Sequence, residues 1–166
     1  MLQTTSQPGA AIELSADVLI ELAESIWRSL LELDIQRVDE LVTELPQDQP
    51  LLTGCVAMAG DWQGSVMLVC PKPIVRKAAA AMFGVSPPDV AETDLSDTMG
   101  ELTHMLSGNL KSLLPGPCRL SPSLVTEGYN IMTGNRIVAQ VFLRSEGLLL
   151  QIILFEREKN YENPDC

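Results

Sequence analysis

The segment from residue 94 to residue 114 constrains the fold more than any other part of the chain, because its pattern predicts one helix with two unlike faces. At about 100° per residue, apolar side chains recur along one side of this helix; they are Leu95, Met99, Leu102, Leu106, Leu110 and Leu113. The opposite side carries what we call the polar row, which consists of Asp97, Glu101, His104, Gly108 and Lys111. A glycine inside a helix costs about 1 kcal/mol relative to alanine. The row therefore favours close approach by another body, although a merely solvated face is the simpler alternative.

Composition indicates a folded domain and argues against two classes of partner. The chain has 166 residues, of which 46% are hydrophobic and 20% charged, as expected of a folded soluble protein. Its net charge of −11 argues against nucleic acid, whose phosphates require clustered Lys and Arg, and against anionic membrane surfaces. No apolar run is long enough to span a bilayer and the N-terminus lacks a secretory signal pattern, so we expect a cytoplasmic protein.

The sequence gives little support to metal binding. The four cysteines, Cys55, Cys70, Cys118 and Cys166, include no C-x-x-C pair, and the chain has one histidine. We expect reduced thiols, buried at Cys55 and Cys70 and exposed at Cys166. Glu-x-x-His is half of a carboxylate-bridged di-iron motif, but a second histidine is missing. We therefore expect no cofactor of the protein's own.

Hydrophobic periodicity predicts one α+β domain over residues 15–156, between a flexible arm at 1–14 and a charged tail at 157–166. Its first elements would be a helix over 15–34 with Trp27 on its flank, then a strand or short helix over 36–45. A hairpin around residues 60–64 and a second helix ending at a Gly84 cap would follow.

The C-terminal third predicts mostly strands. Residues 120–125 would form a strand that either lies at a sheet edge or has Pro122 among its first residues, and the runs IVAQVFLR and LLLQIILFE would form a hairpin. The second run is almost wholly apolar, so both of its faces should be covered or it should pair with another subunit. This strand makes a homodimer a reasonable expectation.

The helix that carries the polar row resembles the motif helix of the CheC/CheX family of chemotaxis phosphatases, and it is closer to that of CheX. The family pattern is an acidic residue or Ser, three residues, Glu, two residues, then Asn, with a later Pro; the helix often continues with Gly-Asn-x-Lys. The residues that match are Asp97, Glu101, Gly108, Asn109 and Lys111. His104 stands where the family has Asn, and Pro122, 18 positions after it, is the candidate proline.

This resemblance implies an α+β fold in which two long helices cover an antiparallel-rich sheet. It also implies action on a phosphorylated receiver domain of the CheY kind, with hydrolysis of its aspartyl phosphate. Glu101 would pair with a receiver lysine and residue 104 would hold the attacking water, while Mg²⁺ would be carried by the receiver. Asp97, Gly108 and Lys111 would contact the partner, with Asn109 and Pro122 as secondary candidates.

His104 leaves the activity open. An amide positions water at any pH, whereas an imidazole changes its charge near neutral pH and differs from Asn in reach. The protein could be a retained phosphatase, a much slower one, or a receiver-binding module without catalysis. For Asn109 we favour a structural role as a buried amide bonded to nearby backbone.

Overall fold

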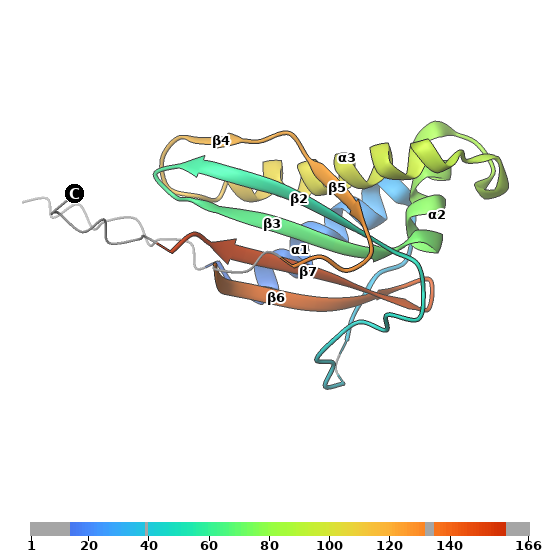
Figure 1. Ribbon diagram of the computed structural model, residues 1–166, viewed down its shortest axis with the longest axis horizontal. Coiled ribbons are helices and arrows are strands. Elements are labelled where there is room, and N and C mark those ends of the chain that lie inside the picture. The colour runs from blue at the N-terminus through green and yellow to red at the C-terminus, as the bar shows by residue number, and fades with distance from the viewer. Residues whose placement is uncertain (1–13, 39, 132–134, 159–166) are drawn as a thin grey trace, which may run out of the picture.

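Residues 14–38, 40–131 and 135–158 are described by this computed structural model, and they form one antiparallel sheet with three helices against one face (Figure 1). The helices are α1 (Ala16–Ile26), α2 (Lys72–Phe83) and α3 (Glu92–Lys111). The strands are β1 (Gln36–Arg37), β2 (Leu51–Gly60), β3 (Gly64–Pro71), β4 (Cys118–Leu120), β5 (Leu124–Glu127), β6 (Arg136–Ser145) and β7 (Leu148–Glu156). Their order in the sheet is β1-β6-β7-β3-β2-β4, with β5 also paired to β2.

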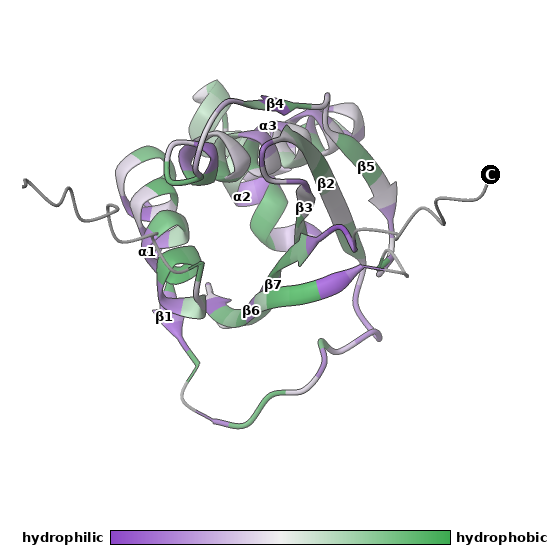
Figure 2. Cartoon of the chain, turned by 90° about the vertical axis from the view of Figure 1, so that its left-hand side faces the viewer, coloured by the Kyte–Doolittle hydropathy of each residue, from purple (hydrophilic) through white to green (hydrophobic). Residues whose placement is uncertain are grey.

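Alternation along the long strands separates the two faces of the sheet. Because successive side chains point to opposite faces, every second residue of β2, β3 and β7 packs under the helices; these include Leu52, Met58, Val66, Leu68, Leu150, Ile152 and Leu154. Residues of the opposite parity form smaller buried groups on the other face, such as Met67, Ile153 and Phe155. Figure 2 shows the helical layer on one side of the sheet, with hydrophobic segments where the helices and the sheet face each other.

Both expected hairpins are present, and β7 lies inside the sheet. β2 pairs with β3 around residues 61–63, and β6 pairs with β7 around Glu146 and Gly147. β7 pairs with β3 on one side and β6 on the other, and residues 150–155 are buried on both faces of the sheet, so its apolar character is explained within one chain. The C-cap of α2 at Gly84 is also confirmed, with a φ of 67° that glycine adopts without strain.

Several local expectations were wrong. The first helix stops being α-helical at Ile26, continues as a π-helix over Trp27–Leu31 and ends at Glu32 in the left-handed region. Trp27 is fully buried and does not lie on a flank. The region 36–45 contributes only two strand residues, and 120–125 is divided between β4 and β5. The sheet-edge position of this region is as expected, but Pro122 lies between the two short strands and not within one strand.

The thiols also differ in part from the expectation. Cys70 is buried, and that burial raises the pKa of its thiol, whereas Cys55 is only half-buried. Cys166, the arm up to residue 13 and the tail from residue 159 lie outside the described residues. Among the described helices, none has the length and apolar content that a bilayer crossing requires.

The height of α3 above the sheet is set where it crosses β2. A Cβ atom on Gly54 would overlap the Thr103 side chain and approach the Met99 carbonyl oxygen at 3.4 Å. Thr103 Oγ1 donates a 2.7 Å hydrogen bond to that same carbonyl, so its side chain is held in place. Gly54 therefore allows α3 to pack directly on the backbone of β2.

We predict that Gly54→Ala destabilises the protein by about 1–3 kcal/mol, because the new methyl group overpacks a rigid contact. Urea unfolding followed by far-UV circular dichroism measures this free energy. Thr103→Ala in the same chain should restore part of the loss, because it removes the nearest atom. A Gly54→Ala protein as stable as the original would show that the crossing is not tightly packed.

Candidate functional site

The polar row lies on the outer side of α3, which runs along the upper edge of the molecule in Figure 1. The predicted range was 94–114. The helix begins two residues earlier, at Glu92, and ends three residues earlier, at Lys111. Its predicted apolar side is buried, except that Leu113 follows the helix and is half-buried. Asp97, Glu101 and His104 are all exposed. Glu101 and His104 are three residues apart, so their Cβ atoms lie about 5–6 Å apart and both can reach one partner site.

The charged residues of the polar row have no partner within the described part of the chain. Asp97, Glu101, His104 and Lys111 take part in no hydrogen bond or ion pair of their side chains there. The cations that do pair with carboxylates lie elsewhere, and they are Arg28, Arg37, Lys72, Arg76, Lys77, Arg136 and Arg144. The carboxylates of the row are thus left available to an outside group.

The row also lowers the stability of its own helix. Asp97 and Glu101 are four residues apart, and like charges at this spacing are destabilising by about 0.2–0.5 kcal/mol. Gly108 adds the cost of a helix-interior glycine. The like charges and the glycine both destabilise the helix, and no contact among the described residues compensates for them. Such uncompensated features are typical of a surface that binds a partner.

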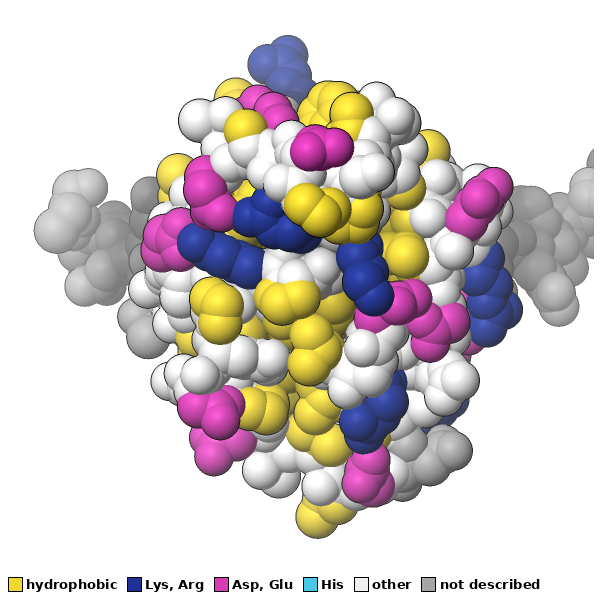
Figure 3. Space-filling view, turned by 90° about the vertical axis from the view of Figure 1, so that its right-hand side faces the viewer, with side chains coloured by type: hydrophobic (Ala, Val, Ile, Leu, Met, Phe, Trp, Pro, Cys, Tyr) yellow, Lys and Arg dark blue, Asp and Glu magenta, His cyan; other side chains and the backbone are white. Residues whose placement is uncertain are grey.

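Ion pairs fix the N-terminal end of α3. Glu92, in the first turn, pairs with Arg76 at 2.7 Å and with Lys72 at 3.7 Å, both from α2. Arg76 also donates a 2.7 Å hydrogen bond to the Val90 carbonyl oxygen just before the helix. Lys72 pairs with Glu127 of β5 at 2.9 Å, and this partner raises the pKa of Lys72. Figure 3 views this end of the molecule, where Lys and Arg side chains lie beside Asp and Glu. The pairs join α2, α3 and β5.

The segment that contains Pro122 lies against α3 beside Glu101. A Cβ atom on Gly100 would lie 2.6 Å from Ser123 Oγ and 3.6 Å from Val125 Cγ2. Pro122 itself is exposed. The structure therefore brings the candidate proline to the flank of the polar row, and it does so through Gly100 and Ser123. Sequence reasoning missed these two residues, and the only available signal was the small residue directly before Glu101.

The remaining candidates lie at the C-terminal end of α3. Asn109 is exposed, so the expectation of a buried amide was wrong; although this residue borders the apolar side of α3, its side chain reaches solvent. Its backbone carbonyl accepts a 2.7 Å hydrogen bond from Ser112 Oγ. Lys111, the last helical residue, is exposed and lies where a cation favours the helix dipole.

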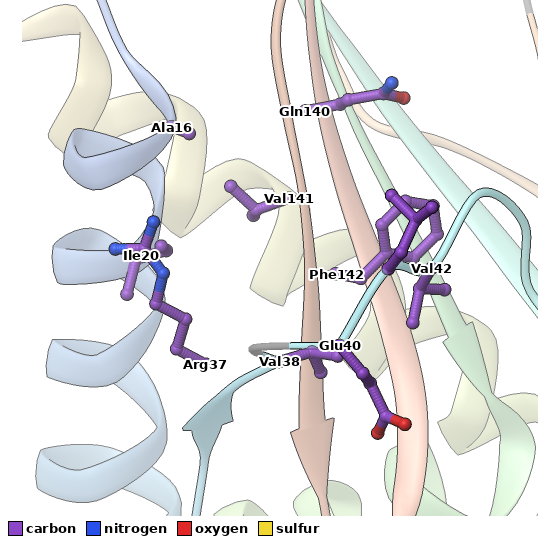
Figure 4. Close-up of a pocket in the computed structure, with 10 residues that line it drawn as sticks. Ala16, Ile20, Arg37, Val38, Glu40, Val42, Gln140, Val141 and Phe142 are labelled. Carbon is purple, nitrogen blue, oxygen red and sulfur yellow. The ribbon is translucent and has the colours of Figure 1, made fainter.

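The outer side of α3, which we call the ridge, is not part of four hollows found in the described residues, because other segments line them. Figure 4 shows one of them, a groove of about 190 Å³ between α1 and β6, where Val141 points toward α1 and Gln140 and Phe142 point away. Another hollow is lined by residues 44–47. Neither is lined by α3, and no group of His, Cys, Asp and Glu in the described residues could hold a metal ion. A ridge of this kind suits a protein partner better than a small molecule, which needs a concave site.

Solved structures with the same fold include chemotaxis proteins named CheX. A CheX protein from Vibrio vulnificus matches with a TM-score of 0.65 and 14% identity, over 85% of this chain and 95% of that one. A CheC-like superfamily protein from Shewanella matches with a TM-score of 0.66 and 16% identity, over 86% and 96%. The CheX–CheY–BeF3–Mg²⁺ complex from Borrelia burgdorferi matches with a TM-score of 0.61 and 14% identity, over 86% and 97%. The expected α+β, CheX-like fold is therefore confirmed.

Sequence comparison identifies the family. None of the curated proteins matches the chain. The sequence model of the family described as chemotaxis phosphatase CheX matches residues 52–143, which include β2, β3, α2, all of α3 and most of β6. This match spans the helix with the polar row and the segment around Pro122. The chain belongs to the CheX family of chemotaxis phosphatases.

Proposed function

We propose that this protein docks the outer side of α3 on a phosphorylated, CheY-like receiver domain and accelerates the loss of its aspartyl phosphate. The observation that carries the proposal is that Glu101 and His104 are exposed, adjacent and unpartnered among the described residues, at the family's motif spacing. The Borrelia relative, which has the same fold, was solved in complex with CheY, BeF3 and Mg²⁺. That complex supports a receiver as the kind of partner.

Glu101 acts as the docking carboxylate. A carboxylate and a lysine ammonium form a charge-assisted hydrogen bond, which is stronger and shorter than a neutral one. Because no cation neutralises Glu101 among the described residues, it is free to pair with a lysine beside the receiver's phosphoaspartate. Asp97, one turn earlier, adds negative charge that steers a basic rim toward the ridge.

His104 orients the attacking water. A neutral imidazole has one nitrogen that accepts a hydrogen bond, so it can hold a water whose oxygen faces the phosphorus atom. The water attacks in line with the aspartyl oxygen, and the bond from phosphorus to that oxygen breaks. The protons of the water stay with the inorganic phosphate that forms, which equilibrates with solvent. The aspartate is regenerated as a carboxylate. The receiver supplies the Mg²⁺, so this chain contributes docking and positioning only.

A second candidate function is receiver binding without catalysis. The observation that favours it is His104 itself, because an imidazole replaces the amide that the family motif places there. Loss of one well-placed polar contact to a transition state lowers rates by about 10²–10³. A protein with such a loss would still bind the receiver through Glu101.

We treat one chain as the docking unit. The homodimer expectation rested on the apolar strand that is now β7, and this strand lies between β3 and β6 within the sheet. All residues proposed for the site lie on α3 and its flank, so the chemistry requires no second copy. Sedimentation velocity of the purified protein measures the oligomeric state directly.

The central prediction concerns phosphate loss. Purified CheY-like receivers from the source organism are phosphorylated with a small phosphodonor, and release of inorganic phosphate is followed with and without this protein. We expect acceleration over spontaneous decay, a loss of about 10²–10³ with His104→Ala, and loss of binding with Glu101→Lys. Glu21→Lys, a charge reversal at an exposed residue of α1, is the matched control and should behave as the original.

Two outcomes separate the candidates. Receiver binding without acceleration, together with activity created by His104→Asn, would establish the binding-only function. Absence of both binding and acceleration for every receiver would overturn the proposal.

The polar row should contribute little to folding. Glu101→Ala and His104→Ala are expected to change the free energy of unfolding by less than about 0.5 kcal/mol, since both side chains are exposed and unpartnered among the described residues. Thermal and urea unfolding measure this free energy. A loss above about 1.5 kcal/mol, which is typical of substitutions that disrupt a buried group, would mark these residues as structural.

A further inference from the structure

The two glycines of α3 have different explanations. Gly100 is buried, and a side chain there would press into Ser123, so intrachain packing requires a residue without Cβ. Gly108 has no atom within 4 Å of the place where a Cβ would lie, apart from its own helix. Packing within the described residues therefore gives no reason for a glycine at position 108.

Backbone conformation gives no reason either. Gly108 is not among the residues with positive φ, and α3 continues through it to Lys111 as a regular helix. Glycine is among the poorest helix formers and lowers stability by about 1 kcal/mol relative to alanine at such a site. The helix thus carries an unfavourable residue at a place where any small side chain would fit.

The position of Gly108 relates it to the rest of the polar row. It follows Glu101 by seven residues and His104 by four, so it lies on the same side of α3, about 10 Å and 6 Å further along the axis at 1.5 Å per residue. The absence of a Cβ exposes the helix backbone there, as occurs where another backbone packs closely. An exposed, unneutralised carboxylate and a bare stretch of helix backbone on one ridge are both suited to a protein partner.

We propose that Gly108 is the point at which the docked receiver packs its own backbone directly on α3, within van der Waals contact. This inference rests on the proposed function, and it extends the docking face from the reacting end of the ridge toward its C-terminal end. Asp97 and Gly108 are eleven residues apart, so the receiver covers at least about 16 Å of the helix. The occupant is the receiver because Gly108 lies on the same side of α3 as Asp97 and Glu101, the exposed carboxylates to which the proposed function assigns receiver docking.

The test uses the full chain and a CheY-like receiver from the source organism loaded with beryllium fluoride and Mg²⁺. Gly108→Ala should raise the thermal midpoint by about 2–4 °C, because alanine is the better helix former. The same change should weaken receiver binding at least fivefold by isothermal titration calorimetry, and Gly108→Leu should weaken it more than thirtyfold. A higher thermal midpoint combined with a lower affinity for the receiver indicates a close-contact site. If Gly108 had only a structural role, a substitution would raise both quantities or lower both.

Ser96→Ala is the matched control, because Ser96 is exposed on α3 away from the polar row and alanine also improves its helix propensity. It should raise the thermal midpoint and leave affinity within twofold. If the original protein binds the receiver and Glu101→Lys abolishes binding while both Gly108 variants bind normally, this inference is overturned and the proposed function stands. If no receiver binds the original protein, both the inference about Gly108 and the proposed function are overturned.

Discussion

The contact between α3 and β2 determines the geometry on which the site depends. Gly54 lets the helix approach the strand backbone, and Thr103, held by its bond to the Met99 carbonyl, fills the space that remains. This contact fixes the rotation of α3, because Thr103 must face the sheet. Once one side of a helix is fixed, its 3.6-residue period leaves Asp97, Glu101 and His104 on the outside.

The surroundings of α3 hold the helix without neutralising its outer side. Ion pairs with Glu92 fix the helix at its first turn, and Ser123 contacts it at Gly100. Neither contact involves the polar row. The fold thus provides a rigid support for exposed groups, which is how proteins position residues that act on another molecule.

The sequence predicted the features of the fold that follow from the periodicity of hydrophobic residues. The two faces of α3 and both hairpins follow from side-chain alternation and glycine turns, and the resemblance to CheX followed from spacing along one helix. The failures depend on tertiary neighbours. Trp27 is buried although its position in the helix suggested a flank, and Asn109 is exposed although it borders the apolar side of α3. The contact of Ser123 with Gly100 joins residues far apart in sequence, which no local pattern reveals.

The uncompensated carboxylates of α3 have a kinetic consequence. Asp97 and Glu101 project from a ridge on a chain of net charge −11, so their attraction acts before contact and speeds the encounter with a basic partner. Added salt screens that attraction beyond about 10 Å at 0.1 M. Ionic strength should therefore slow association, whereas the lifetime of the complex depends on short-range packing that salt hardly affects. The association rate and the lifetime of the complex therefore depend on different residues of α3.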